Sequence, residues 1–352
     1  MLNRFMEYEN NIHFARANIG ENFQNEFYKP EMKNTFVVSS YWIHTDNLHY
    51  FYTNSLLCNY FIKKDKALFL IHPECEDFYG PIKLQEKGPF FHARATSSCR
   101  TLLMYPDDNP NLLFFGKLSI NKIIDYCTRT IPLGEVSRSV GTTIFLDDLK
   151  KKDALPENFD YFREVIGMIP KNFDRGGMII REVHPKLLTS NIMPFFALFT
   201  KQKDNEYPIL RNYNKSFYIN KKHYVKKKII RPFIKQFIAL SKLGIAMECH
   251  AQNVLIEVEN GTIKCFIYRD FGGFNINLKT VPIHLKMPYV SDILIEYHQD
   301  KRETIFRNSL DYFDHNILFE IYKIFNLDSK DIYDLKIIKK YLKKYKFSDK
   351  YV

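Results

Sequence analysis

The sequence lacks several features that would place it in a common class of protein. Its longest apolar stretches, such as Ile192 to Phe199, are far shorter than the roughly 20 residues that a helix needs to cross a bilayer. Its polar start, Met1 to Arg4, does not have the pattern of a signal peptide. It also contains no internal repeat and no low-complexity tract. We therefore expect a cytoplasmic protein that does not span a membrane.

Paired cysteines are absent as well. The sequence has no C-x-x-C pair, which argues against both a disulfide framework and a zinc site. We expect reduced thiols that mostly serve as packing residues. The six scattered cysteines are Cys58, Cys75, Cys99, Cys127, Cys249 and Cys265.

Hydrophobic residues and positive charge are plentiful. At 352 residues, with 45% hydrophobic and 16% aromatic residues, the chain can form one large core or two moderate ones. The formal net charge of +11 suits nucleic acid, an anionic membrane, or a site for highly charged small anions. No zinc-finger or RNP-type pattern favours nucleic acid. We therefore expect small-molecule substrates, and neither a nucleic-acid nor a membrane partner. The basic runs, Lys221-Lys222, Lys226 to Lys228 and Lys339 to Lys346, are ordinarily solvated helix faces.

The pattern of hydrophobic residues predicts a mixture of strands and helices. Residues 34–72 contain short runs typical of strands, and Leu112 to Ser119 also reads as a strand. Asn121 to Thr130 could form a short helix. Residues 175–200 fit either two buried strands or a strand and a helix. Beyond residue 290 the pattern becomes helical again.

The clearest helix runs from about Lys222 to Leu243, because apolar residues recur there at three- and four-residue spacing. Gly244 is a plausible C-cap. Pro232 within the pattern predicts a kink, or a helix that begins at that residue.

A hairpin follows this helix. Residues Gly244 to Gly273 read GIAMECHAQNVLIEVENGTIKCFIYRDFGG, in which Asn260-Gly261 is the dipeptide preferred in a two-residue type I′ turn. Residues across the hairpin should then have numbers that sum to about 521, so that Asn253 lies opposite Tyr268. Asp270 would lie at the same open end as the residues before the first strand.

This open end collects polar side chains that suit a metal–triphosphate complex. Asn253 and Asp270 offer the hard oxygen ligands that magnesium prefers, and His250 and Gln252 lie beside them in the sequence. The structural alternative is that His250 and Gln252 satisfy buried backbone groups while Asp270, with Arg269, caps the strand. Four convergent polar groups beside apolar strands would be costly to bury without a function.

A second set of polar residues precedes the helix. Ser98 and Arg100 lie in the run ATSSCRT, Lys117 in GKLS, and Arg129 in TRT. Guanidinium groups bind phosphate and carboxylate oxygens through paired hydrogen bonds, and hydroxyls can add to them. Each motif alone is weak, and their value lies in their co-occurrence.

Four stretches of this sequence resemble, in order, motifs of the citrate-type siderophore synthetases that act independently of peptide synthetases, the aerobactin synthetase type. The stretches are Leu70 to Pro73, Ser98 to Thr101, Lys117 through Thr130, and Gly244 to Asn253 followed by Arg269-Asp270. Gly177 to Glu182 is also similar to a segment of that family. The resemblance covers roughly residues 70–275, and its last motif is the most specific.

The resemblance implies an α+β protein with the cupped-hand fold of that family. Residues 1–70 would form a divergent, reduced thumb-like region, 71–215 a central fingers-like region with a mixed sheet that binds nucleotide, and 216–352 a palm-like C-terminal region that is helical and carries the hairpin. It further implies a ligase of siderophore biosynthesis and iron acquisition. With ATP and Mg²⁺, such a ligase adenylates a carboxylate, such as citrate, before an amine or alcohol attacks. The resemblance leaves open whether the protein forms a homodimer.

The resemblance also implies roles for individual residues. Ser98, Arg100 and Lys117 would contact ATP, and Arg129 would hold phosphate and carboxylate oxygens. His250 would orient the carboxylate or stabilise charge, which makes it catalytic together with Arg129. At the open end of the hairpin, Gln252, Asn253 and Asp270 would bind the nucleotide, and the last two would also bind magnesium.

Departures from the family pattern keep other functions open. The sequence lacks the family's H-P-x-H-P segment, Asp125 stands where the family tends to have Thr, and Glu74-Cys75 stands in place of Trp-Gln. The missing segment and Asp125 favour a non-catalytic module that binds nucleotide or carboxylate, whereas Glu74-Cys75 indicates either a different substrate or a partly degenerate site. Asp270-Phe271-Gly272 also spells the D-F-G of kinases, but Gln252 occupies the position of the kinase base. A small-molecule phosphotransferase is therefore the weaker alternative.

Overall fold

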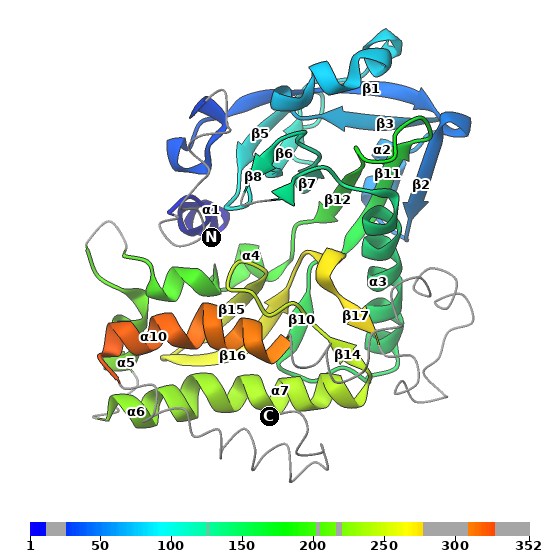
Figure 1. The fold of residues 1–352 in the computed structure, drawn as a ribbon. Helices are drawn as coiled ribbons and strands as arrows, with labels where there is room; N and C mark the ends of the chain where they lie inside the picture. Colours follow the sequence, from blue (N-terminus) through cyan, green and yellow to red (C-terminus); the bar gives the residue numbers. More distant parts are fainter. Residues whose placement is uncertain (12–25, 125–126, 202–204, 216–219, 277–308, 328–352) are drawn as a thin grey trace. The chain divides into compact units, whose positions relative to one another are not determined.

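The computed structural model describes residues 1–11, 26–124, 127–201, 205–215, 220–276 and 309–327. Their contacts divide the chain into two compact units, each described by itself below (Figure 1). The sheet unit comprises residues Leu2–Ile144 and Phe162–Pro185, and the hairpin unit comprises Phe145–Tyr161 and Lys186–Val352 with Met1. The division into three regions at residues 70 and 215 stays a prediction.

The sheet unit is built on a nine-stranded sheet with the order β2-β11-β12-β7-β6-β5-β1-β3, in which β4 also pairs with β1. All of these pairs are antiparallel. The strands are β1 (Phe36–His44), β2 (Leu48–Tyr52), β3 (Lys66–Ile71), β4 (Glu86–Lys87), β5 (Phe91–Ala95), β6 (Thr101–Pro106), β7 (Phe114–Leu118), β11 (Glu164–Pro170) and β12 (Met178–Glu182).

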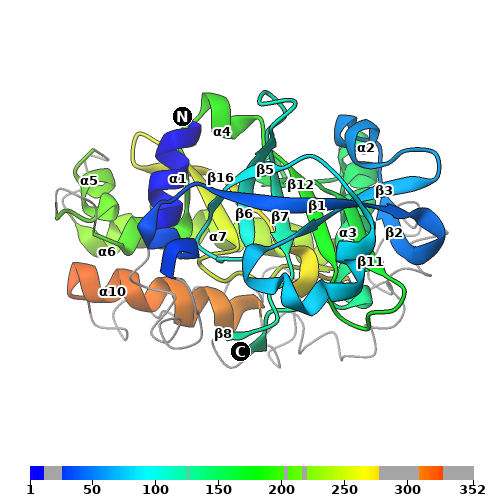
Figure 2. The ribbon, with the colours of Figure 1, turned by 90° about the horizontal axis from the view of Figure 1, so that it is seen from above.

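Strand β1 joins two parts of this sheet. Its first residues, Phe36 to Val38, pair with β5, whereas Ser39 to His44 pair with β3. Figures 1 and 2 both show β1 and β3 side by side. The strands expected within residues 34–72 and 112–119 are confirmed, with a short helix, α2 (Leu56–Phe61), between β2 and β3.

Three α-helices belong wholly or partly to the sheet unit. The α-helices of the unit are α1 (Leu2–Asn10), α2 and the first part of α3 (Leu133–Lys151), inside which the boundary between the units falls. Strand β11 meets α3 closely, since a Cβ atom added at Gly167 would lie 2.7 Å from Val136 Cγ1 and 2.9 Å from its carbonyl oxygen. The 3₁₀ segments are Glu26–Tyr28, Pro30–Met32, Thr45–Asn47, Pro73–Cys75 and Asp77–Leu84.

The helix expected at Asn121 to Thr130 is wrong. Two short antiparallel strands, β8 (Ile123–Ile124) and β9 (Cys127–Thr128), occupy this segment. Ile123 and Thr128 are β-branched residues, which favour strands, and they face each other across the pair. Asp125 lies outside the described residues.

The hairpin unit contains a four-stranded mixed sheet with the order β10-β16-β15-β13, in which only β10 and β16 are parallel. A separate pair joins β14 to β17. The strands are β10 (Phe159–Tyr161), β13 (Ile192–Pro194), β14 (Ile245–Ala246), β15 (Val254–Glu259), β16 (Thr262–Tyr268) and β17 (Asn275–Ile276). The helices are α4 (Lys186–Thr189), α5 (Pro208–Lys215), α6 (Lys221–Tyr224), α7 (Arg231–Lys242) and α10 (Phe319–Phe325), with 3₁₀ segments Phe195–Phe199 and Phe271–Gly273 and a π turn at Asp314–Leu318.

The long helix predicted before the hairpin is confirmed, and it contains a π turn. Helix α6 runs through a π turn, Val225–Ile230, into α7, which has Pro232 in its first turn. The Arg231 N–H donates to the carbonyl of Lys226, five residues earlier, so the backbone bonds change register just before the proline. Gly244 has a φ of 76° and follows the last helical turn, as expected of a C-cap.

The burial pattern explains the π turn. Buried residues occur in adjacent pairs along the helix, and the first two pairs are separated by five residues, whereas the later ones are separated by four. One wider turn keeps all the pairs on one face. The pairs are Tyr224-Val225, Ile229-Ile230, Phe233-Ile234 and Phe237-Ile238. Phe233 packs this face against Phe266 of β16, with 6.0 Å between the ring centroids.

The hairpin has the predicted turn and a different register. Asn260 and Gly261 have φ values of 47° and 70°, as a type I′ turn requires. The predicted sum of 521 holds for Glu259 opposite Thr262, but a bulge then shifts the register. As a result Val254, and not Asn253, lies opposite Tyr268.

No helix within the described residues is long and apolar enough to cross a membrane. Free thiols occur at five cysteines whose side chains the structure describes: Cys58, Cys75, Cys99, Cys249 and Cys265. The basic run at residues 339–346 lies outside the described part.

A buried ion pair joins β11 and β12. Arg181 Nε donates to Glu164 Oε1 at 3.1 Å, and the two side chains are only 3% and 0% exposed. We expect Arg181→Met to lower the free energy of unfolding by about 3–5 kcal/mol, because it removes the guanidinium that pairs with the buried carboxylate of Glu164. Lys66→Met, which breaks the exposed pair with Glu86, should cost about 0–1 kcal/mol in the same urea denaturation experiment. Equal losses would contradict the structural role of Arg181.

His72 begins the 3₁₀ segment Pro73–Cys75 and is fully buried beside the rings of Tyr28 and Phe36. Its Nδ1 accepts a hydrogen bond from the N–H of Glu74 at 3.1 Å. Burial, with a further contribution from Lys122, lowers the pKa of His72 to about 3. The imidazole is therefore neutral in the folded protein.

This burial makes stability depend on pH. Below its ordinary pKa of 6.5, His72 of the unfolded chain takes up a proton that the folded chain does not. As the pH is lowered from 6.5 to 3, the free energy of unfolding should thus fall by up to about 1.4 kcal/mol per pH unit. His72→Asn, which retains a capping acceptor, should reduce this slope in urea denaturation series, whereas the exposed control His49→Asn should not. Identical slopes in both variants would rule out His72 as the source.

Candidate functional site

Two cations share one carboxylate in the sheet unit. Lys117 lies on β7, opposite Thr101 of β6, and its side chain is only 2% exposed. Lys117 Nζ lies 2.7 Å from Oε1 of Glu135, in the first turn of α3, and Arg100 Nη2 lies 3.7 Å from the same oxygen. Two cations thus gather at one carboxylate, an arrangement that suits an anionic ligand.

Arg129 is tied to this cluster through its backbone. Its carbonyl accepts hydrogen bonds from Arg100 Nη1 at 3.1 Å and from the N–H of Ile120, also at 3.1 Å. Its own N–H donates to the carbonyl of Lys122 at 3.0 Å. The structure therefore brings Arg100, Lys117 and Arg129 together.

Ser98 occupies the turn between β5 and β6, two residues before Arg100. Its hydroxyl accepts a hydrogen bond from the N–H of Thr101 at 3.0 Å, which stabilises the turn. Cys99 adopts a φ of 63°, in the left-handed region that non-glycine residues rarely occupy. The turn is closed by the hydroxyl of Thr96, which donates to the carbonyl of Thr101 at 2.8 Å. In this structure Ser98 therefore has at least a structural role.

The open end of the hairpin gathers the other predicted residues in the hairpin unit. The carbonyl of His250 accepts hydrogen bonds from the N–H groups of Asn253 and Val254, which form a tight turn. Arg269 Nε and Nη2 both donate to the carbonyl of Gln252, at 3.0 and 2.8 Å. The Arg269 N–H also donates to the Asn253 carbonyl. The sequence predicted that the residues just before β15 and just after β16 meet at the open end of the hairpin, and these hydrogen bonds confirm it. The register between the two strands differs from the predicted one by one residue.

The backbone fixes the tautomer of His250 when its ring is neutral. Its Nδ1 accepts a hydrogen bond from the N–H of Gln252 at 3.2 Å. A neutral imidazole that accepts at Nδ1 carries its proton on Nε2. His250 thus presents a hydrogen-bond donor, which suits an oxygen that bears or develops negative charge.

Glu248 organises the residues around Asn253. Asn253 Nδ2 donates to Glu248 Oε2 at 2.9 Å, so the amide oxygen is the acceptor end of that side chain. A Cβ atom added at Gly273 would lie 2.3 Å from Glu248 Oε2 and 2.9 Å from its Cβ. Only glycine leaves room for this carboxylate.

Asp270 adopts a φ of 67°, in the left-handed region, immediately before the 3₁₀ segment Phe271–Gly273. Such a backbone conformation is uncommon for residues other than glycine and concentrates at functional sites. The oxygen atoms of Asn253 and Asp270, with the nearby carboxylate of Glu248, are hard donors of the kind that magnesium prefers. Within the described residues, no three His, Cys, Asp or Glu side chains form a group that could hold a metal by themselves.

The helical segment 309–313 packs against this loop. Ser309 Oγ donates to the carbonyl of Met247 at 2.5 Å and contacts Cys249 Sγ at 3.2 Å. Burial raises the pKa of Cys249 to about 12, so its thiol stays protonated. The ring of Tyr312 lies 6.3 Å from that of His250, and the negative charge of Glu248 is the main cause of its raised pKa.

Three of these residues had not been identified as site residues from the sequence. Glu248 stands within the most specific motif, so its position in that motif was a signal. Glu135 lies in a helix about 18 residues after Lys117, and Tyr312 follows the hairpin by more than 40 residues. Neither of these two belongs to a recognisable motif.

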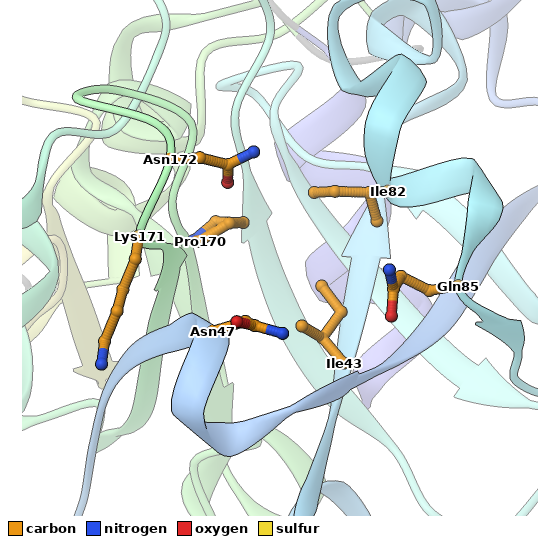
Figure 3. Close-up of a pocket in the computed structure, with 7 residues that line it drawn as sticks. All are labelled: Ile43, Asn47, Ile82, Gln85, Pro170, Lys171 and Asn172. Carbon is orange, nitrogen blue, oxygen red and sulfur yellow. The ribbon is translucent and has the colours of Figure 1, made fainter.

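A pocket in the sheet unit lies apart from the predicted residues. It has a volume of about 300 Å³. Figure 3 shows the amides of Asn47, Gln85 and Asn172 around it, with Ile43 and Ile82 on one side and the Lys171 side chain directed away. Such a lining suits a neutral polar group better than a charged one, and it contains none of the predicted site residues.

Comparisons with known proteins agree with the predicted resemblance. Residues 82–200 match the sequence model of the IucA / IucC family, and residues 235–317 match that of the ferric iron reductase FhuF-like transporters. No curated protein matches the sequence.

Solved structures give the fold. The petrobactin biosynthesis protein AsbB from Bacillus anthracis str. Sterne is 18% identical with a TM-score of 0.75, over 99% of this chain and 69% of that protein. ATP-bound aerobactin synthetase IucA from a hypervirulent pathotype of Klebsiella pneumoniae is 15% identical with a TM-score of 0.68, over 97% and 69%. Aerobactin synthetase IucC from the same source is 15% identical with a TM-score of 0.66, over 94% and 65%.

The chain is therefore an α+β protein with the fold of the siderophore synthetases. Its match over residues 82–200 makes it an IucA/IucC-like chain, which confirms the resemblance drawn from the four motifs.

The close approach of Gly273 to Glu248 can be tested by substitution. We expect Gly273→Ala to lower the free energy of unfolding by about 1–3 kcal/mol, because the new methyl group overlaps the Glu248 side chain as far as its Cβ. Gly80→Ala is the matched control, since a Cβ atom there would meet nothing within 4 Å. It should change the free energy by less than about 1 kcal/mol. If urea denaturation gives the same value for both variants, Glu248 does not constrain position 273.

Proposed function

We propose that this chain is an ATP-dependent ligase of siderophore biosynthesis, which adenylates a carboxylate such as citrate and joins it to an amine or an alcohol. The cluster of Arg100 and Lys117 on Glu135 carries the proposal. It gathers two cations within the residues that match the IucA / IucC family. A buried lysine that served only as packing would be costly, whereas a paired one can be held for a ligand.

The sheet unit would bind the triphosphate. Lys117 and Arg100 suit phosphate oxygens, the lysine as a point charge and the arginine through paired hydrogen bonds. The side chain of Arg129, whose backbone is fixed to Arg100, would hold the oxygens of phosphate and carboxylate. Ser98 would contact ATP from the neighbouring turn.

The hairpin unit would supply a donor and metal ligands. His250, protonated at Nε2 when neutral, would donate to a carboxylate or phosphate oxygen and so stabilise charge as it develops. Asn253 and Asp270 would hold Mg²⁺, with Asn253 oriented by Glu248. When bound, Mg²⁺ would neutralise part of the negative charge of the triphosphate. Gln252 would contribute to nucleotide binding.

The proposed reaction has two steps. A carboxylate oxygen of the acid attacks the α-phosphorus of ATP, and the bond from that phosphorus to the pyrophosphate oxygen breaks. An amine or hydroxyl then attacks the acyl carbon, loses a proton, and displaces AMP. Both steps pass through crowded anionic states, which preorganised cationic and hydrogen-bond donor groups stabilise.

The names of the similar proteins support the siderophore context. AsbB is a petrobactin biosynthesis protein, and IucA and IucC are aerobactin synthetases, one of them solved with ATP. The FhuF-like model that matches residues 235–317 describes a ferric iron reductase-like family. Each name concerns iron or a siderophore, which favours an acid substrate from that chemistry.

The proposal predicts pyrophosphate release that depends on ATP, Mg²⁺ and a di- or tricarboxylate, with hydroxylamine as the acceptor. Arg129→Gln and His250→Ala should each lower kcat by about 100-fold or more, as for the loss of a group that stabilises a transition state. The exposed controls Arg175→Gln and His49→Gln should retain activity. AMP should be the nucleotide product.

Other outcomes would identify a different function. Release of ADP would indicate phosphoryl transfer to a small molecule. Tight ATP binding by calorimetry, without pyrophosphate release for any acid in the panel, would indicate a non-catalytic nucleotide-binding module. Full activity in both Arg129→Gln and His250→Ala would show that the site has been assigned to the wrong residues.

A further inference from the structure

A basic pocket lies in the hairpin unit at the turn end of the hairpin. It has a volume of about 510 Å³ and lies between the long helix and the start of β16. Five of its lining side chains are cationic and one is acidic. The cationic residues are Lys227, Lys228, Arg231, Lys235 and Lys264, and the acidic residue is Glu157.

The long helix places the charges on one face. Arg231 and Lys235 lie four residues apart in α7, and Lys227 lies in the π turn that precedes them. Like charges at this spacing destabilise a helix unless an anion offsets them. Arg231 and Lys235 form no ion pair within the described part of the chain. Lys264, in contrast, is partly neutralised by Glu259 at 3.1 Å.

Hydrogen bonds fix the walls of the pocket. Lys228 Nζ donates to the hydroxyl of Thr262 at 2.7 Å, which ties the π turn to the hairpin. The carbonyl of Asn158 accepts from Gln236 Nε2 at 2.8 Å and from the N–H of Phe266 at 2.9 Å. The cations are therefore mounted on a preorganised frame, in a concave site where their fields add.

The pocket is separate from the residues proposed for catalysis. It lies beside Thr262 to Lys264, whereas Asn253 and Asp270 flank the other end of the two strands. Strands of this length separate the two ends by roughly 17 Å, at about 3.3 Å per residue. A ligand here would not occupy the proposed metal site.

We propose that this pocket binds a compact anion that carries three or more negative charges, borne by phosphate or carboxylate groups. The volume is that of a small-molecule site. The lining carries five cations and one anion, with Glu259 beside Lys264, and this excess of cations matches such a ligand. Nucleic acid would instead need a basic track that extends beyond one pocket.

The test is calorimetric titration with tripolyphosphate, citrate and orthophosphate, at low salt and at about 150 mM salt. The pocket variant is Arg231→Gln with Lys235→Gln. The control variant is Lys221→Gln with Lys242→Gln, which removes the same charge from the same helical run outside the lining. Thermal denaturation of both double variants checks that they fold.

The wild type and the control should bind tripolyphosphate or citrate more tightly than orthophosphate. In the pocket variant this binding event should be at least about tenfold weaker, while any binding of the same anion at the proposed catalytic site should be unchanged. Tighter binding of tripolyphosphate would identify phosphate as the anionic group of the ligand, and tighter binding of citrate would identify carboxylate. Equal binding by the two double variants would overturn the site, and so would binding of an oligonucleotide but of neither small anion. The ATP-dependent pyrophosphate release of the pocket variant should equal that of the wild type. This assay therefore tests the proposed ligase activity independently of the pocket.

Discussion

The carboxylate of Glu248 is the constraint on which the hairpin loop depends. It accepts a hydrogen bond from the Asn253 amide, and it occupies the space that any side chain at position 273 would need. Its negative charge also raises the pKa of Tyr312, so the tyrosine hydroxyl remains a donor. One acidic side chain thus binds an amide, requires a glycine and affects the ionisation of a tyrosine, at positions that are far apart in the sequence.

Glu135 has a comparable role in the sheet unit. It holds Lys117 and Arg100 by a single oxygen, and Arg100 in turn holds the backbone of Arg129. In each unit, therefore, an acid that is not itself proposed to react positions a group proposed to bind ligand: cations for the anion in the sheet unit, and the metal ligand Asn253 in the hairpin unit. Each acid also lowers the local net charge, which reduces the cost of holding several donors together when no ligand is bound.

Short-range signals in the sequence predicted much of the hairpin unit. Asn260-Gly261 identified the turn and Gly244 the end of the helix, because both depend on backbone conformations that few residues adopt. The bulge that shifts Val254 opposite Tyr268 could not be predicted, since no glycine or proline marks it. The helix expected at Asn121 to Thr130 failed because a few β-branched residues pair locally as strands, a choice that the helical pattern did not reveal.

The candidate functional site likewise contains residues that a sequence motif identifies and residues that only the folded structure reveals. Residues within motifs, such as Lys117 and Asn253, were identified from the sequence, and the structure shows which neighbours hold them. Glu135 and Tyr312 were not identified, because each reaches its partner only through tertiary packing from another element. Glu248 was visible in its motif, but its partners, Asn253 and Gly273, emerge only when the loop is folded.

The π turn at Val225–Ile230 has a consequence for comparing this chain with its relatives. A π turn is equivalent to one residue inserted into an α-helix, and here the five-residue step between buried pairs shows where the extra residue lies. A relative with an uninterrupted α-helix would align correctly only with a gap inside this turn. Without that gap, residues on one side, including the lysines before Arg231, would be matched to positions that are one residue out of phase and face another direction.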